Sequence, residues 1–353
     1  MIYDKIFRPL LFQLDAEVAH DSGVKVLELA SRSKLIRKAI SAFCSSNTNQ
    51  DRSTCLFGLK FPNKIGLAAG LDKDGRFPLI SESIGFGHVE VGTVTPLPQP
   101  GNPKPRLFRI PESNALVNRM GFNNNGVDAL VLRVKKLYPK SVRKIPLGIN
   151  IGKGKDTPLE NAANDYTLGF SKVCDVADYI TINISSPNTP NLRKLHDVNY
   201  LLPLLKSVRD VRNQHASEVG GATPPCLIKI SPDETFAQIE QLVGLACDYN
   251  FNGIIACNTS VRQPSAWFGK GYPGGGVSGT PLDSRANEVI KFISKLTHGR
   301  LPIIGAGGVS DIQNAQQKLD AGASLLQIYT SLIYKGPLWP SRLAKALPIA
   351  REW

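Results

Sequence analysis

Short apolar runs rich in β-branched residues recur along the chain from residue 55 onward, and stretches with helical spacing separate them. We expect strands at residues 64–69, 88–93, 145–151, 179–184, 226–231, 253–257, 302–306 and 324–329. Near-continuous apolar strands that alternate with helices are typical of a parallel sheet covered by helices. Eight such units within about 300 residues favour a closed barrel over an open doubly wound sheet. The sequence therefore predicts an α/β protein with a (β/α)8 TIM barrel.

The first 50 residues follow a different pattern, with two apolar stripes at helical spacing, the first directly after Pro9. The first stripe consists of Leu10, Leu11, Leu14 and Val18, and the second of Leu35, Ile36, Ala39, Ile40 and Phe43. The charges between residues 29 and 43 are all basic, at Arg32, Lys34, Arg37 and Lys38. We expect a small N-terminal α-helical extension of two amphipathic helices over residues 1–50, a polar linker at 45–54 and a barrel domain over residues 51–353.

Such an extension could serve in two ways, which the residues leave open. It could be a helical cap packed on the barrel, or an interfacial segment that binds a membrane surface, and one helix pair could do both. No apolar stretch approaches the roughly 20 residues of a spanning helix. Acidic residues at Asp4, Asp15 and Glu17 argue against a transit peptide.

The net charge of +13 on 353 residues indicates an anionic partner or a solvated basic surface. The sequence has no RNP motif, zinc-finger spacing or block of consecutive basic residues, so we expect no nucleic-acid partner. The six cysteines form no C-x-x-C pair and no Cys/His cluster, which predicts reduced thiols and no metal site. Cys226 and Cys257 lie in strand-like runs and are expected in the core.

In a barrel, the reacting groups gather where the strands end. The residues at these positions are mostly amides and lysines, with little His, Asp or Glu: Gly70, Lys73, Thr93, Asn150, Asn183, Lys229, Asn258 and Thr259. This set does not suit metal-assisted hydrolysis or a glycosidase with paired carboxylates. It suits a site that holds a flat, amide-bearing, anionic molecule by many hydrogen bonds.

The glycine turn "GAGGVS" at 305–310 follows the seventh strand, where barrels commonly bind a phosphate on backbone N–H groups. Together with Gly279 in "GVSGTP", it predicts a phosphate site. A phosphorylated planar cofactor, flavin mononucleotide (FMN), fits both observations. The connection at 94–123 is too long for a simple βα loop and is expected to be an elaborated active-site lid.

Several longer motifs carry a resemblance to a known family. They are "GLAAGLDKDG", "EVGTVTPLPQPGNPKPRLFR", "NRMGFNNNGVD", "INISSPNTPNLR", "SGTPL" and "LPIIGAGGV" followed by "AGASLLQIYTSLIYKGP". The chain resembles the class 2, quinone-dependent dihydroorotate dehydrogenases over nearly its whole length. The resemblance implies oxidation of (S)-dihydroorotate to orotate in de novo pyrimidine biosynthesis, with one FMN per chain and a membrane quinone as electron acceptor.

The resemblance also implies a role for the polar segment "SSPNTPNLR", which follows the fourth strand. Ser186 matches the general base that takes a proton from C5 while a hydride passes from C6 to flavin N5; class 1 enzymes have cysteine at this position. A lone serine hydroxyl is a poor base, so the site must supply preorganised help. The positions that match substrate contacts are Lys73, Asn118, Arg119, Met120, Gly121, Phe122, Asn183, Asn188, Asn258 and Thr259.

The positions that match flavin contacts extend over most of the strand ends. They are Ala69, Gly70, Leu71, Asp72, Lys73, Thr93, Asn150, Asn183, Lys229, Cys257, Gly279, Gly308, Tyr329 and Thr330. Lys229 lies within an apolar strand, where a buried ammonium needs an anion, and a reduced flavin would supply one. Cys257 stands where the family has threonine; a thiol hydrogen-bonds weakly, so we expect only a backbone contact there.

By the same resemblance, the extension forms the passage for the quinone, and His20, Arg109 and Tyr329 match the quinone pocket. The basic residues at 32–38 would suit anionic lipid head groups. These features predict a monomer that is peripheral to the cytoplasmic face of the cell (inner) membrane. Two alternatives remain: a class 1 enzyme with a soluble acceptor, and a non-enzymatic barrel that binds nucleic acid.

Overall fold

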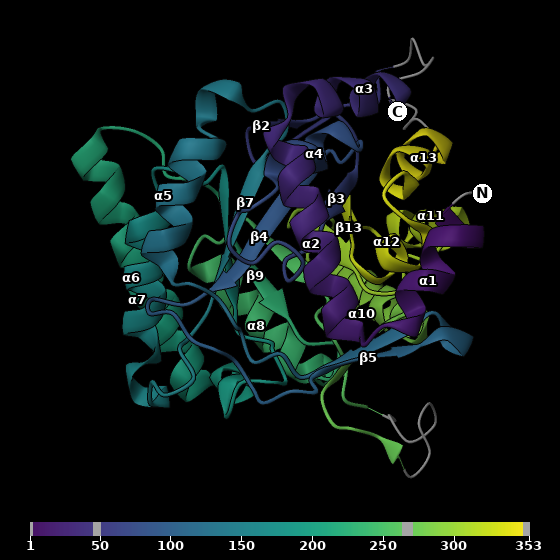
Figure 1. Ribbon diagram of the computed structural model, residues 1–353. Coiled ribbons are helices and arrows are strands. Elements are labelled where there is room, and N and C mark those ends of the chain that lie inside the picture. The colour runs from purple at the N-terminus through teal and green to yellow at the C-terminus, as the bar shows by residue number, and fades with distance from the viewer. Residues whose placement is uncertain (1–2, 45–50, 263–270, 349–353) are drawn as a thin grey trace.

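The computed structural model describes residues 3–44, 51–262 and 271–348 and contains a closed barrel of eight parallel strands (Figure 1). The strands follow one another around the barrel as β3 (Ile65–Leu67), β4 (His88–Val94), β7 (Leu147–Ile151), β8 (Tyr179–Asn183), β9 (Cys226–Ile230), β10 (Gly253–Ala256), β12 (Ile303–Ala306) and β13 (Leu325–Ile328). Seven of them lie within the predicted runs, and β4 extends one residue beyond its run of 88–93. The predicted (β/α)8 barrel with an N-terminal helical extension is confirmed.

Helices surround the barrel and cover its outer face. They are α4 (Pro78–Ser83), α5 (Val127–Leu137), α6 (Ala162–Val173), α7 (Val198–Val219), α8 (Phe236–Asp248), α10 (Asp283–Leu296), α11 (Ile312–Asp320), α12 (Thr330–Lys335) and α13 (Trp339–Ala346). Side chains in the preceding loops cap several of them. Asp197 caps α7, Thr235 forms a capping box with Gln238 at α8, and Asp311 caps α11.

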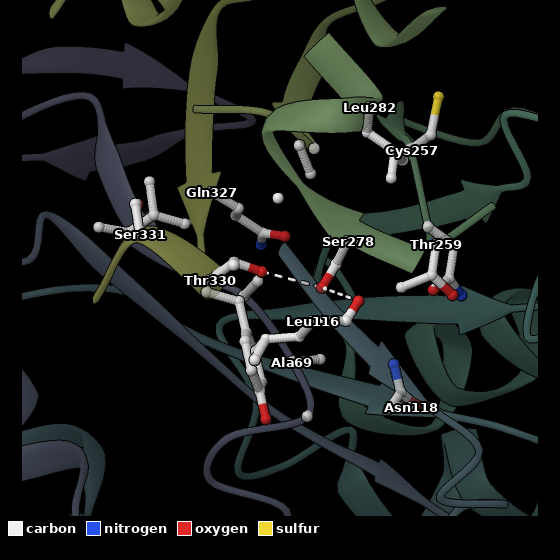
Figure 2. Close-up of a pocket in the computed structure, with 18 of the residues that line it drawn as sticks. Ala69, Leu116, Asn118, Cys257, Thr259, Ser278, Leu282, Gln327, Thr330 and Ser331 are labelled. Carbon is white, nitrogen blue, oxygen red and sulfur yellow. Dashed lines mark hydrogen bonds between the residues drawn. The ribbon is translucent and has the colours of Figure 1, made fainter. Parts of the chain in front are cut away.

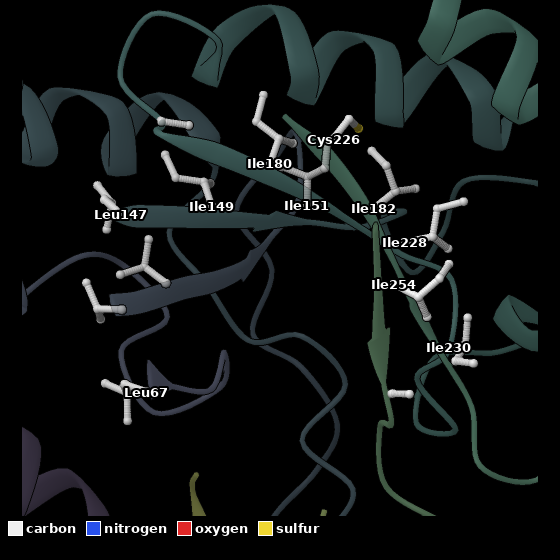
Figure 3. Close-up of a cluster of buried hydrophobic side chains, with 14 of the residues drawn as sticks. Leu67, Leu147, Ile149, Ile151, Ile180, Ile182, Cys226, Ile228, Ile230 and Ile254 are labelled. Carbon is white, nitrogen blue, oxygen red and sulfur yellow. The ribbon is translucent and has the colours of Figure 1, made fainter. Parts of the chain in front are cut away.

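The main core lies between the outer face of the strands and these helices (Figure 3). Because successive residues of a strand point to opposite faces, Leu147, Ile149 and Ile151 of β7 share the outward direction, while Asn150 faces the interior. Cys226 belongs to the same outer layer, as predicted. The opposite, inward positions are therefore free to carry polar groups.

The lower end of the barrel interior is closed by a separate apolar cluster. A hairpin of β1 (Thr54–Leu56) and β2 (Leu59–Phe61) contributes Phe61, which is fully buried. Tyr179, Leu227 and Ile304 pack in the same cluster. This plug leaves the carboxyl ends of the strands as the open end of the barrel.

The long connection after β4 and the segment after β10 form a small antiparallel sheet, which the sequence analysis did not predict in detail. Its strands are β5 (Leu107–Ile110), β6 (Ala115–Asn118) and β11 (Gly276–Gly279), with β6 in the centre. Residues from all three strands line the cavity described below, so the connection does cover the strand ends.

The N-terminal extension consists of a π-helical turn (Tyr3–Phe7), α1 (Arg8–Gln13), α2 (Ala16–Arg32) and α3 (Lys34–Cys44). The expectation of one helix through Leu10–Val18 is wrong. Asp15 interrupts it, because its side chain accepts the N–H groups of Glu17 and Val18 and starts α2. Residues 45–50 of the predicted linker lie outside the described residues.

The extension packs on the barrel domain, as one of the two expected arrangements requires. Helix α2 contacts α4 and β5, and α3 contacts α4 (Figure 1). Buried Glu17 pairs with Arg106, and Glu28 pairs with Arg76. Within the described ranges, no helix combines the length and the apolar character needed to cross a bilayer.

Candidate active site

A cavity of about 290 Å³ opens at the carboxyl ends of the barrel strands, below the sheet of β5, β6 and β11. Asn118, Ser278 and Gln327 point from three different elements toward this space (Figure 2). It brings together most of the predicted site residues: Ala69, Gly70, Lys73, Thr93, Asn118, Met120, Gly121, Phe122, Asn183, Ser186, Asn188, Lys229, Cys257, Asn258, Thr259, Gly279, Gly308, Tyr329 and Thr330.

Four predicted contact residues do not line the cavity. Leu71 packs in the main core, and Asn150 lies one layer below Thr93. Asp72 is buried and accepts the backbone N–H groups of the following turn, and burial raises its pKa to about 6. The Arg119 guanidinium points away and donates to two proline carbonyls. These four side chains therefore lie outside the cavity wall, where they pack or hydrogen-bond against neighbouring parts of the protein.

The loop after β8 places Ser186 in the cavity wall, with its side chain 5% exposed. Its Oγ accepts the backbone N–H of Asn188 at 3.2 Å. Asn188 in turn donates from Nδ2 to Asn118 Oδ1 of β6 at 3.1 Å. No carboxylate or imidazole among the described residues hydrogen-bonds to Ser186. Among the described residues, the hydroxyl therefore has no side-chain base in direct contact.

Arg193 explains why a basic residue ends the polar segment. Its guanidinium donates to the Asp233 carboxylate at 2.8 Å and to the carbonyl oxygen of Thr259 at 3.2 Å. Those partners belong to the loops after β9 and β10. Arg193 thus ties three neighbouring loops together, and it fixes the loop that carries Ser186.

A chain of hydrogen bonds runs from the barrel interior into the cavity. Asn150 Oδ1 accepts from Thr93 Oγ1 at 2.5 Å and from Asn183 Nδ2 at 3.1 Å. Asn183 Oδ1 then accepts from Ser185 Oγ at 3.1 Å, and Asn258 Nδ2 donates to Ser185 Oγ at 3.0 Å. All five side chains are thereby held in defined orientations at the cavity floor.

Two lysines supply positive charge to the cavity. Lys229 on β9 is 6% exposed and makes no hydrogen bond or ion pair with the described residues. Burial lowers its pKa, and the nearby Glu90 charge opposes this effect. Lys73 donates to Asn123 Oδ1 at 2.8 Å, and burial, with a contribution from the Arg106 charge, lowers its pKa to about 8. Both ammonium groups suit an anionic ligand.

The glycine turn after β12 and Gly279, the last residue of β11, form one edge of the cavity. Gly308 has φ +80°, and a Cβ there would lie 2.4 Å from Asp283 Cα. Gly279 has φ +98°, and a Cβ there would lie 2.3 Å from Asn114 O. Ser278 Oγ and Thr330 Oγ1 are 2.9 Å apart beside them (Figure 2). Only glycine fits at both positions, which leaves backbone and small hydroxyl groups at this edge.

A buried ion pair supports the glycine turn from the outside. Lys318 of α11 is fully buried, and its Nζ donates to Asp283 Oδ1 at 2.6 Å and to Asn287 Oδ1 at 2.9 Å. Asp283 begins α10 and touches Gly308, as the Cβ distance indicates. The ion pair therefore neutralises a carboxylate that lies directly behind the expected phosphate position.

Cys257 follows β10 and lines the cavity. Its backbone N–H donates to Ala306 O at 2.9 Å, so only its carbonyl is available for a ligand. Burial raises the pKa of the thiol to about 12. All six cysteines are free, and the described ranges contain no group of His, Cys, Asp and Glu that could hold a metal ion.

The three residues predicted for the quinone lie on different elements. Tyr329 lines the main cavity. Arg109 of β5 lines a second cavity of about 350 Å³ beside α1, and its guanidinium donates to the carbonyls of Leu11 and Leu14. His20 lies on α2, where burial and the nearby Lys73 charge lower its pKa to about 4. Leu107 lines both cavities.

The sequence analysis missed several residues of the site. Glu90 and Gln327 lie in the barrel interior beneath the predicted amides, and Gln327 also lines the cavity. Ser278 and Leu107 come from the small sheet. One signal was available for Glu90: it is a carboxylate in the middle of the apolar run 88–94.

Comparisons with known proteins agree with this arrangement. The family model described as dihydroorotate dehydrogenase matches residues 52–350. A relative from Chloroflexus aurantiacus, named dihydroorotate dehydrogenase (quinone), is 44% identical over 98% of this chain and 96% of its own. One of the same name from Cellvibrio japonicus is 46% identical over 94% of each chain. The crystal structure of DHODH from Eimeria tenella in complex with ferulenol is 34% identical, has a TM-score of 0.82 and covers 94% of this chain and 90% of that one.

Fold, site and relatives together define a barrel oxidoreductase. The chain belongs to the dihydroorotate dehydrogenase family, among its quinone-dependent members.

Proposed function

We propose that this protein binds one FMN per chain and oxidises (S)-dihydroorotate to orotate with a membrane quinone, as a step of de novo pyrimidine biosynthesis. The single observation that carries the cofactor assignment is Lys229. Its ammonium is buried, lines the cavity and makes no bond to the described residues. A buried cation of this kind is stable only opposite an anion. A flavin that gains negative charge on reduction fits this requirement.

The rest of the cavity suits the other parts of FMN. Gly308, Gly279 and Ser278 would hold the phosphate, because they offer backbone and hydroxyl groups without bulky side chains. Asn183 and Thr93 would face the ring. Held there, FMN would supply the hydride acceptor for C6 of dihydroorotate.

The remaining chemistry falls to side chains of this protein. Ser186 would take the proton from C5, and Asn118, Asn188 and Asn258 would hold the pyrimidine by hydrogen bonds. Lys73 would pair with the carboxylate of the substrate. The hydrogen bonds of these groups to one another support the assignment, since they preorganise the site before the substrate arrives.

The extension would bind the membrane and admit the quinone. Ten of its large apolar side chains are exposed: Ile6, Phe7, Leu10, Leu14, Val18, Val26, Leu29, Leu35, Ile36 and Phe43. Together with the basic residues at 32–38, they fit an anionic lipid surface. His20, Arg109 and Tyr329 would contact the quinone between the extension and the barrel. We infer a peripheral, monomeric protein on the cytoplasmic face of the cell membrane.

One experiment tests both half-reactions. Dihydroorotate is added anaerobically to the purified protein, and a water-soluble quinone analogue follows. We expect the flavin absorption band to bleach with the first reagent and to recover with the second. Recovery with fumarate or NAD and none with the quinone would indicate a class 1 enzyme instead. A colourless protein retained on nucleic acid would indicate a binding barrel.

A further inference from the structure

A buried carboxylate that has no part in the chemistry above lies beneath the cavity. Glu90 of β4 is fully buried in the barrel interior. Its Oε1 accepts from Asn150 Nδ2 at 2.8 Å, and its Oε2 accepts from Gln327 Nε2 at 2.9 Å. Thr181 Oγ1 and Tyr179 OH donate to Oε2 as well, at 3.1 and 3.2 Å. Four donors therefore converge on two oxygens.

This arrangement suits the ionised form of Glu90. The two amide nitrogens can only donate, and each carboxyl oxygen receives one of them. Burial, together with the Glu90 charge, raises the pKa of Tyr179 well above its usual value, so the phenol stays protonated and donates. An ionised carboxylate can only accept hydrogen bonds, so each of its four partners must act as the donor.

That direction is transmitted to the cavity through the amides. An asparagine side chain can present either its oxygen or its nitrogen to a neighbour. Because Glu90 requires Nδ2 of Asn150, Oδ1 of Asn150 must face Thr93 and Asn183. Asn183 then offers Nδ2 to this oxygen and turns its own Oδ1 toward the Ser185 hydroxyl. One charge thus sets the orientation of both amides.

Glu90 also affects Lys229. No hydrogen bond links Glu90 to the ammonium; its four donors among the described residues are Asn150, Gln327, Thr181 and Tyr179. Its negative charge nevertheless opposes the lowering of the pKa of Lys229 by burial. The carboxylate thereby favours the charged form of Lys229 and leaves its N–H groups for a ligand.

We propose that Glu90 is a positioning residue of the cofactor site: it fixes the direction of the Asn150–Asn183 amide chain and places a buried negative charge beneath the bound cofactor. The proposal rests on the proposed function, because the cofactor in question is FMN. It assigns Glu90 an effect on the bound flavin that a residue of merely structural importance would not have.

The test compares Glu90→Gln with Glu82→Gln and with the wild type. Glu82 is a matched control, since its carboxylate accepts a tyrosine hydroxyl, from Tyr138 at 3.1 Å, but lies on α4 outside the barrel. Each flavin-free protein is titrated with FMN, its thermal unfolding is recorded, and the midpoint potential of its bound FMN is measured. For Glu90→Gln we expect FMN binding weaker by about ten- to a hundredfold, the range for a lost hydrogen bond to a charged group.

The midpoint potential provides the decisive readout. Reduction adds negative charge to the bound flavin, so removal of the buried Glu90 charge beneath it should make the potential more positive, whereas Glu82→Gln should leave it unchanged. A Glu90→Gln protein with wild-type potential would overturn the proposal, even if it unfolds at a lower temperature. A wild type that takes up no FMN would overturn the proposed function as well.

A second variant covers the case in which Glu90→Gln does not fold. Thr181→Val removes one donor from the carboxylate and keeps its charge. The less neutralised carboxylate should shift the potential in the opposite direction, to a more negative value. An unchanged or more positive potential in Thr181→Val would overturn the proposal.

Discussion

Glu17 of α2 and Arg106 of the segment before β5 form a buried ion pair, with Arg106 Nη2 2.8 Å from Glu17 Oε1. The Arg106 guanidinium also donates to the carbonyls of Pro100 and Asn102. One side chain thus joins the extension to the connection that covers the active site. The position of the extension is therefore coupled to that of the connection that covers the cavity.

The first prediction concerns this pair. Glu17→Gln should lower the free energy of unfolding by about 3 kcal/mol, because it leaves the Arg106 charge buried without its partner. Glu240→Gln, at an exposed position of α8, is the control and should cost less than about 0.5 kcal/mol. Urea denaturation measures both values. Equal stability of the two variants would contradict the coupling.

The same pair predicts an acid dependence. Burial alone would raise the pKa of Glu17, but the hydrogen bonds from Arg106 and Lys104 outweigh it and hold the pKa below its usual value. A carboxyl with a lowered pKa in the folded state stabilises that state above its unfolded pKa and loses this contribution as the pH falls through the folded pKa. The stability difference between wild type and Glu17→Gln should therefore shrink in acid.

The second prediction concerns the base. Ser186→Ala should retain FMN and lose orotate formation by about 10²- to 10⁴-fold, the usual contribution of a general base. Ser171→Ala is the control, since that hydroxyl only donates to a carbonyl within α6. Flavin absorbance and anaerobic reduction by dihydroorotate measure the two properties separately. Reduction at the wild-type rate would rule out Ser186 as the base.

The third prediction is a pH profile. Burial lowers the pKa of Lys73 to about 8, so its charge is lost as the pH rises through this value. If Lys73 binds the substrate carboxylate, kcat/KM for dihydroorotate should fall about tenfold per pH unit above pH 8, because this ratio reports groups of the free enzyme. Lys73→Gln should have a low kcat/KM that no longer falls as the pH rises above 8. If kcat/KM of the variant still falls above pH 8, a group other than Lys73 causes the fall.

The fourth prediction concerns the membrane surface. Leu35 of α3 is 79% exposed, and Leu132 of α5 is 70% exposed on the barrel. Leu35→Ser should weaken binding to vesicles with anionic lipids by about tenfold, the cost of one leucine side chain withdrawn from lipid. Leu132→Ser should have no effect. Co-sedimentation measures both, and equal loss in the two variants would contradict a membrane role of the extension.

The fifth prediction tests whether the glycine turn after β12 binds the phosphate of the cofactor and not its ring. Lys318→Met leaves the Asp283 carboxylate unpaired behind the glycine turn. FMN binding should weaken by about tenfold or more, because the uncompensated charge repels the phosphate. Riboflavin has no phosphate, so its binding should change much less. Titration with both ligands gives the comparison, and equal losses would place the phosphate elsewhere.

The sequence was sufficient for the barrel because both faces of its strands are buried. Each strand therefore reads as a continuous apolar run, and all eight were found. Strands β5 and β6 were missed because they lie in a connection rich in proline and glycine, which reads as a loop. The break between α1 and α2 was missed because apolar spacing continues through it, while the decisive feature is the cap formed by Asp15.

Within the site, the motifs predicted residues that lie near one another in sequence or follow strand ends. They did not predict residues whose importance comes from a distant partner. Lys318 reads as a surface residue of an amphipathic helix until Asp283, 35 positions away, is brought beside it. The role of Glu90 similarly becomes visible only when the fold brings Asn150 and Gln327 of other strands beside it.

Leu107 forms part of the wall of both cavities. Under the proposed function, dihydroorotate would occupy the first cavity, so Leu107 would form part of the substrate site as well as of the hollow beside Arg109. A substitution that changes the bulk of Leu107 therefore changes the walls of both cavities together.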